Sequence, residues 1–237
     1  MTVLYEDNHI IAVNKAVGEI VQGDKTGDTP LSETVKVYIK EKYNKPGEVF
    51  LGVTHRLDRP TTGVVLFART SKALARLNEM FKEKSQSAHN QSFITKTYWA
   101  IVEGCPQLEE ARLEHWLLRN EKQNKSYVVK PGTKDAKQAV LEYKVLNRGD
   151  HYSLVEVNLL TGRHHQIRCQ MAAIGCPVKG DLKYGARRSN PDGGICLHAR
   201  EISFAHPVHK NPDTSEPIRL TITAPVPETD IWKKICL

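Results

Sequence analysis

Two arginines, a histidine and a carboxylate lie within five consecutive residues of THRLDRPTTG, residues 54–63. An aspartate is ionised at neutral pH, so Asp58 is a candidate nucleophile that needs no separate general base. Arg56 and Arg59 favour its ionised form, and the flanking apolar segments are suited to a partly dry cleft. The same residues also fit a solvated turn in which Asp58 caps the backbone. Taken alone, this stretch favours the turn.

A second polar group, TGRHHQIR at residues 161–168, strengthens the catalytic interpretation. It places Arg163, Gln166 and Arg168 beside the first turn of an expected helix that follows a strand. Cationic and amide side chains at such a position are suited to phosphate or base contacts. The alternative is an ordinary solvated helical face.

The histidines and cysteines do not predict a metal site. His164 and His165 are adjacent, so on a helix their side chains point about 100° apart and are poorly placed to share an ion. His206 and His209 lie in a proline-containing segment without a partner at zinc-finger spacing. We therefore expect structural or substrate-contacting histidines. Motifs for dinucleotide binding, a phosphate-binding Walker loop and a serine hydrolase are also missing, so no nucleotide cofactor is expected.

Charge and composition favour a nucleic-acid partner. The 237 residues carry 34 Lys and Arg against 27 Asp and Glu, a net charge of +7, and the pI is about 9.1. Such a surplus favours anionic partners, with nucleic acid ahead of a membrane surface. The first residues contain no apolar stretch typical of a signal peptide, and the five cysteines form no C-x-x-C pair. We expect a cytoplasmic protein with reduced thiols and no membrane partner.

Hydrophobic patterning predicts an α+β fold with a mixed, mainly antiparallel central sheet and a few flanking helices. A first helix is expected from Thr29–Pro30, a second with Ser71 as its N-cap and a third within 162–175. The expected strands are 9–15, 49–53, 63–70, 95–104, 111–119, 125–130, 139–148, 151–160, 195–206 and 217–226. No shift in composition marks a second folded domain, so residues 1–237 are expected to form a single catalytic domain.

Five segments, in order and spacing, resemble the pseudouridine synthases of the RluA type. They are LYEDNHIIAVNKAVG, GVTHRLDRPTTGVVLFART, KTYWAIVEG, TGRHHQIRCQMAAIGCPVKGDLKYG and LHAREISFAHPV. The resemblance implies the pseudouridine synthase fold with a central active-site cleft. It also implies a cofactor-free isomerase that converts uridine in ribosomal RNA or tRNA to pseudouridine, here without the separate N-terminal RNA-binding module of many relatives.

The resemblance assigns a role to individual residues. Asp58 corresponds to the catalytic aspartate, Tyr98 to the tyrosine of the uracil pocket and Arg168 to the arginine paired with the catalytic carboxylate. Arg56 corresponds to an arginine that enters the RNA stack as the target base leaves. We expect His55, Arg163 and Gln166 to contribute to substrate binding, and we assign no role to Arg59.

Two other functions fit parts of the pattern. An RNA-binding or chaperone protein on the same fold needs little or no catalysis, although Asp58, Tyr98 and Arg168 are all present. A metal-dependent nuclease is disfavoured, because no second carboxylate accompanies Asp58. Which RNA and which uridine are modified, and whether Asp58 attacks ribose C1′ or uracil C6, do not follow from the residues. A monomer is the expectation from the family.

Overall fold

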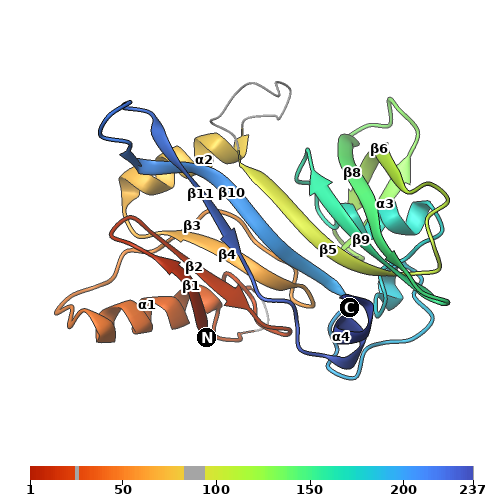
Figure 1. Ribbon diagram of the computed structural model, residues 1–237, viewed down its shortest axis with the longest axis horizontal. Coiled ribbons are helices and arrows are strands. Elements are labelled where there is room, and N and C mark those ends of the chain that lie inside the picture. The colour runs from red at the N-terminus through yellow and green to blue at the C-terminus, as the bar shows by residue number, and fades with distance from the viewer. Residues whose placement is uncertain (25–26, 83–93, 237) are drawn as a thin grey trace. The chain divides into compact units, whose positions relative to one another are not determined.

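The computed structural model describes residues 1–24, 27–82 and 94–236. The chain divides into two compact units, each built from segments that are separate in the sequence. The first unit contains Met1–Ile94 and Glu201–Pro225, and the second contains Thr95–Arg200 and Val226–Leu237. We describe each unit by itself (Figure 1).

The first unit is built on antiparallel strands that carry the Asp58 loop. Its sheet has the order β1-β2-β4-β10, with the short β3 beside β4 and with β11 beside β10. These strands are β1 (Thr2–Glu6), β2 (Ile10–Lys15), β3 (Gly52–Val53), β4 (Thr62–Ala68), β10 (Leu197–Lys210) and β11 (Pro217–Thr223). Both β2 and β4 are almost entirely buried, as expected for continuous apolar runs in the middle of a sheet.

Two helices accompany the strands of this unit, α1 (Leu31–Lys42) and α2 (Ser71–Lys82). Pro30 is the N-cap of α1 and Leu31, Val35 and Ile39 are buried, as the apolar spacing predicts. The side chain of Leu74 from α2 lies so close to β3 that a Cβ at Gly52 would come within 2.7 Å of it. Glycine at this position therefore allows the helix to approach the strand.

The second unit contains antiparallel strands in the order β5-β9-β8-β6-β7, in which β6–β7 and β8–β9 are hairpins. These strands are β5 (Thr95–Glu103), β6 (Glu110–Asn120), β7 (Lys125–Val129), β8 (Lys137–Arg148) and β9 (Tyr152–Leu159). The unit also contains α3 (Gln166–Ala173), the short 3-10 helix η1 (Leu182–Tyr184) and α4 (Asp230–Cys236). Trp232 and Ile235 of α4 pack on Ile101 of β5 and Leu154 of β9, so the C-terminal helix covers part of this sheet.

The α+β prediction, with a mainly antiparallel sheet and flanking helices, is confirmed. The pairs β1–β2, β2–β4, β3–β4, β10–β11, β5–β9, β9–β8, β8–β6 and β6–β7 are all antiparallel. Some details differ from expectation. Thr70 Oγ1 rather than Ser71 accepts the N–H of Ala73 at the start of α2, β10 continues to Lys210, and neither β1 nor α4 is among the predicted elements. No helix in the described ranges is both long and apolar enough to cross a membrane.

Candidate active site

The loop that carries Asp58 begins where β3 ends, and two side chains fix its first turn. Thr54 Oγ1 donates to the carbonyl of Leu66 in β4 at 2.5 Å, and the N–H of Leu66 donates to His55 Nε2 at 3.0 Å. His55 Nε2 is thus an acceptor, so the neutral ring carries its proton on Nδ1. His55 anchors the loop to β4, and its expected contact with substrate stays a prediction.

Lys15, at the end of β2, holds the middle of the same loop. Its side chain is 1% exposed, and Nζ donates to the carbonyls of Ala16 and Arg59 at 3.0 Å and of Thr61 at 2.7 Å. Burial lowers the pKa of Lys15 to about 8, although the nearby carboxylates of Glu19 and Asp58 act in the opposite direction. The ammonium supplies one N–H to each carbonyl, so it fixes the backbone path on either side of Pro60.

Asp58 and its two neighbouring arginines have different surroundings. Asp58 is partly exposed, and its carbonyl accepts the N–H of Thr61 at 3.0 Å, which closes the turn. Arg56 is exposed on the loop, whereas Arg59 donates to Asp28 at 2.5 Å in an exposed ion pair. The structure thus supplies for Arg59 a protein contact that the sequence did not indicate.

Tyr98 lies in β5 of the second unit, opposite Val157 of β9. The residue is 9% exposed, so most of its ring is covered by protein. A tyrosine in a central strand has a fixed backbone and few accessible rotamers, which suits a residue expected to form the wall of a base pocket.

The segment before α3 is organised by the amide of Gln166. Its Oε1 accepts from Thr161 Oγ1 at 2.8 Å and from the N–H of Arg163 at 2.9 Å, while Nε2 donates to the carbonyl of Val140 at 3.0 Å. Gln166 is 3% exposed, so this buried amide joins the start of the helix to β8. Arg163 donates through Nε to the carbonyl of Gln138 at 2.9 Å. The expected substrate contacts of Arg163 and Gln166 stay predictions.

Arg168, on the first turn of α3, is paired with a carboxylate that sequence reasoning missed. Its Nε and Nη2 donate to Asp181 at 2.6 and 2.9 Å, and the two side chains are 6% and 1% exposed. Asp181 lies in GDLKYG, residues 180–185, within one of the five segments that carry the family resemblance, but the resemblance assigned it no role. Asp181 places a carboxylate against the buried guanidinium, which offsets part of the cost of burying that charge.

The two adjacent histidines do not lie as expected on a helix. Helix α3 begins at Gln166, and His165 adopts a left-handed conformation with φ 53°. The rings of His164 and His165 are stacked, with centroids 3.7 Å apart, so the expected separation of about 100° is wrong. Burial, followed by the charges of Arg168 and His164, lowers the pKa of His165 to about 2. His165 is therefore neutral at physiological pH.

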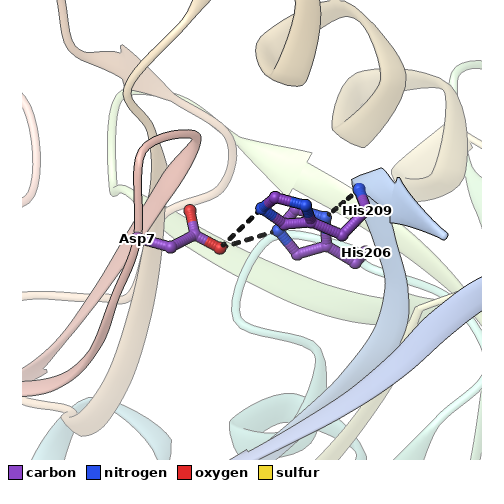
Figure 2. Close-up of side chains that lie close together, drawn as sticks. All are labelled: Asp7, His206 and His209. Carbon is purple, nitrogen blue, oxygen red and sulfur yellow. Dashed lines mark hydrogen bonds and ion pairs between the residues drawn. The ribbon is translucent and has the colours of Figure 1, made fainter. Parts of the chain in front are cut away.

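His206 and His209 have a partner that spacing along the chain did not reveal (Figure 2). His206 Nε2 lies 2.8 Å from Asp7 Oδ2 and His209 Nε2 lies 3.9 Å from it, and all three ligand atoms are within 4.8 Å of one another. However, His206 Nδ1 accepts the N–H groups of Val208 and His209. The ring proton is therefore on Nε2, where it donates to Asp7.

This arrangement favours a hydrogen-bonded cluster of Asp7, His206 and His209, called the clasp below, over a metal centre. A metal ion on His206 Nε2 would have to replace the only ring proton, whereas a ligating histidine normally keeps a proton on its other nitrogen. Burial would raise the pKa of Asp7, but hydrogen bonds from the N–H groups of His9 and Ile10, from Tyr5 and from His206 lower it. The clasp joins the turn between β1 and β2 to the end of β10 within the first unit.

The predicted residues fall in both units. Asp58, Arg56 and His55 are in the first, and Tyr98, Arg163, Gln166 and Arg168 are in the second. Within each unit the structure adds one buried charged residue that the sequence did not indicate, Lys15 and Asp181. The first unit thus presents a carboxylate on an anchored turn, and the second presents a covered aromatic ring and an arginine on a fixed helix start.

The sequence profile of the RNA pseudouridylate synthase family matches residues 9–173. The chain belongs to the RNA pseudouridylate synthase family. The match includes the Asp58 loop, Tyr98 and Arg168, and it ends before Asp181.

Relatives with curated names agree with this membership. The chain is 32% identical over 210 residues to the uncharacterised RNA pseudouridine synthase YlyB of Bacillus subtilis, covering 87% of this chain and 65% of that protein. It is 32% identical over 213 residues to the ribosomal large subunit pseudouridine synthase C of Escherichia coli K12, covering 86% and 62%. The chain thus spans less than two thirds of the length of these RNA pseudouridylate synthases.

Solved structures support the fold. The human RNA pseudouridylate synthase domain containing 4 matches with a TM-score of 0.75 at 23% identity, covering 96% of this chain and 89% of that one. The human RNA pseudouridylate synthase domain containing 1 matches with a TM-score of 0.67 at 23% identity, covering 99% and 86%. At this level of identity the likeness is one of fold within the RNA pseudouridylate synthase family.

Proposed function

We propose that this protein is an RNA pseudouridine synthase that isomerises a uridine in ribosomal RNA. The observation that carries the proposal is the family match over residues 9–173, which contains Asp58 on its anchored turn. The names of relatives such as the ribosomal large subunit pseudouridine synthase C favour ribosomal RNA over tRNA. The net charge of +7 suits a polyanionic substrate.

The proposed reaction uses only groups of the protein. The carboxylate of Asp58 attacks ribose C1′ or uracil C6, the bond between C1′ and N1 breaks, and the detached uracil turns. A bond then forms between C1′ and C5, the C5 proton leaves, N1 takes up a proton in its place, and the carboxylate is released. Hydrogen and charge balance without an oxidant, a reductant or a metal ion. We propose a cytoplasmic, monomeric enzyme without a cofactor.

The other predicted residues have roles in binding and alignment under this proposal. The target uridine must leave the RNA stack, which costs on the order of a few kcal/mol, and the exposed guanidinium of Arg56 fills the vacated space. Tyr98 offers a ring face to the uracil and a phenol near C5 for proton removal. Arg168 aligns the carboxylate of Asp58. His55, Arg163 and Gln166 shape the substrate-binding surface through the backbone segments that they hold.

The test measures tritium release from RNA labelled at uridine C5. Ribosomal RNA and tRNA are supplied separately, with excess EDTA to remove divalent metal ions. The wild-type protein is expected to release tritium from ribosomal RNA, and Asp58→Asn is expected to lose at least about a thousandfold in rate because an amide is not a nucleophile. The control is Asp150→Asn, an exposed aspartate of the second unit, which should keep the wild-type rate.

The outcomes separate the proposal from its alternatives. RNA binding without tritium release from either RNA would favour the RNA-binding or chaperone interpretation. Tritium release that requires a divalent metal ion would contradict the metal-free reaction. Tritium release from tRNA alone would contradict ribosomal RNA as the substrate. Equal rates of tritium release for Asp58→Asn and the wild type would show that Asp58 takes no part in the reaction.

A further inference from the structure

The bidentate pair between Arg168 and Asp181 fixes the orientation of a guanidinium. Nε donates to Oδ2 at 2.6 Å and Nη2 donates to Oδ1 at 2.9 Å. Because two parallel hydrogen bonds join two planar groups, the pair restrains both the position and the rotation of the guanidinium. Both side chains are almost completely covered, so little water is available to replace either partner.

Asp181 itself lies on a turn with little freedom. Gly180 has φ +89°, and a Cβ there would come within 2.7 Å of the Asn190 side chain, so only glycine fits directly before Asp181. The carbonyl of Asp181 accepts the N–H groups of Tyr184 at 3.0 Å and Ala186 at 3.1 Å. The backbone of Asp181 is thus fixed independently of α3.

The ring of Tyr184, three residues after Asp181, also packs against the guanidinium of Arg168. The Cζ of Arg168 lies 5.1 Å from the centroid of the Tyr184 ring, within the range of a cation–π contact. The Tyr184 hydroxyl accepts the N–H of Ser126 at 2.8 Å and lies 3.0 Å from His165 Nδ1. Tyr184 is thus held through its hydroxyl by β7 and by the residue before α3.

We propose that Asp181 is a positioning residue for the isomerisation, which holds Arg168 in the orientation that aligns the nucleophilic carboxylate. The inference rests on the proposed function. A buried arginine with several rotatable bonds does not keep one orientation by packing alone, and the paired carboxylate fixes it. Asp181 does not touch substrate, so its contribution passes entirely through Arg168.

The test compares kcat and KM of Asp181→Asn and Asp181→Glu with those of the wild type and of Asp150→Asn. Asparagine retains one acceptor oxygen but loses the charge and the bidentate geometry. We expect kcat to fall about 10- to 100-fold, as for misplacement of a catalytic group by about 1 Å, while KM for RNA changes less than about threefold because no substrate contact is lost. Asp181→Glu restores the charge and should recover part of kcat, and Asp150→Asn should match the wild type.

Folding is monitored by circular dichroism, and all rates are measured well below the midpoint of thermal unfolding of each variant. If Asp181→Asn does not fold, Asp181→Glu, which keeps the charge, carries the comparison. A folded variant with kcat within twofold of the wild type would overturn the inference, as would a loss confined to KM. A wild-type protein inactive on both RNAs would overturn the proposed function and this inference together, so the two failures are distinguishable.

Discussion

Lys15 in the first unit and Arg168 in the second are both buried, and these two cations are held differently. Lys15 in the first unit donates to three neutral carbonyls, whereas Arg168 in the second unit donates to the carboxylate of Asp181. A compact ammonium with three donors suits converging carbonyls, and a planar guanidinium suits a carboxylate. Lys15 therefore fixes the backbone path of the Asp58 loop. The carboxylate of Asp181, in contrast, orients the guanidinium of Arg168.

The difference shows which changes each unit can tolerate. The Asp58 loop depends on main-chain carbonyls, which are present whatever side chains the loop carries, so its shape depends chiefly on Lys15. The bidentate pair of the arginine depends on a particular side chain at position 181, so that pair is lost with one substitution. Removing Lys15 should chiefly affect stability, and removing Asp181 should chiefly affect kcat.

The largest stability effect is expected for Lys15→Met. The substitution keeps an unbranched apolar stem but leaves the carbonyls of Ala16, Arg59 and Thr61 without their shared donor, at a cost of about 2 kcal/mol or more. Urea unfolding of the wild type and the variant measures this loss. Lys40→Met, an exposed position of α1, is the control and should change the free energy of unfolding by less than about 0.5 kcal/mol. Equal effects of the two substitutions would contradict the role given to Lys15.

A smaller effect, which depends on pH, is expected beside Arg168. The pKa of His165 is about 2 in the folded protein against an ordinary value of 6.5, so the unfolded chain takes up the proton first as pH falls. Stability is therefore complete above about pH 6.5 and is lost below it, by about 1–2 kcal/mol between pH 7 and pH 5. His165→Asn removes the titrating ring, and asparagine tolerates the left-handed backbone.

Urea unfolding at pH 7 and pH 5 measures this effect as the difference between the wild type and His165→Asn. The contribution of other histidines with lowered pKa, such as His115 and His206, is common to both proteins. The variant should lose less stability on acidification than the wild type. An unchanged loss between pH 7 and pH 5 would show that His165 is not the group that responds.

The smallest effect is expected for the exposed pair in the Asp58 loop. The side chains of Arg59 and Asp28 are 41% and 55% exposed, so water screens their attraction. Asp28→Asn should lower the free energy of unfolding by less than about 1 kcal/mol. Thermal unfolding at low and at high salt checks this, because a surface pair weakens with added salt. A loss as large as that of Lys15→Met would make Arg59, too, a determinant of the loop.

Most helices and strands could be predicted from patterns that are local in the sequence. The first helix follows from Leu31, Val35 and Ile39 on one face, and the strands of the second unit follow from alternating residues between turns, although their order in the sheet does not. Local patterns also predicted a helix after residue 161, although α3 begins only at Gln166. The reason is the left-handed backbone of His165, which no apolar spacing reveals.

Contacts between segments that are far apart in the chain could not be predicted from the sequence. The residues Asp7 and His206 are 199 positions apart, and Lys15 and Thr61 are 46 positions apart. A buried lysine or aspartate has the same one-letter code as an exposed one, so the roles of Lys15 and Asp181 emerge only when burial and partners are known. The roles of Asp58, Tyr98 and Arg168 rest on motif order and stay predictions.

The discontinuous make-up of the first unit has a consequence for the order of events during synthesis. Strand β4 follows the Asp58 loop directly, but its neighbour β10 enters this unit only at Glu201. At the usual pace of translation, the intervening residues take on the order of 10 s to make. During that interval the edge of β4 that pairs with β10 in the folded protein has no such partner. The Asp58 loop is thus made well before the strand that completes the sheet beside it.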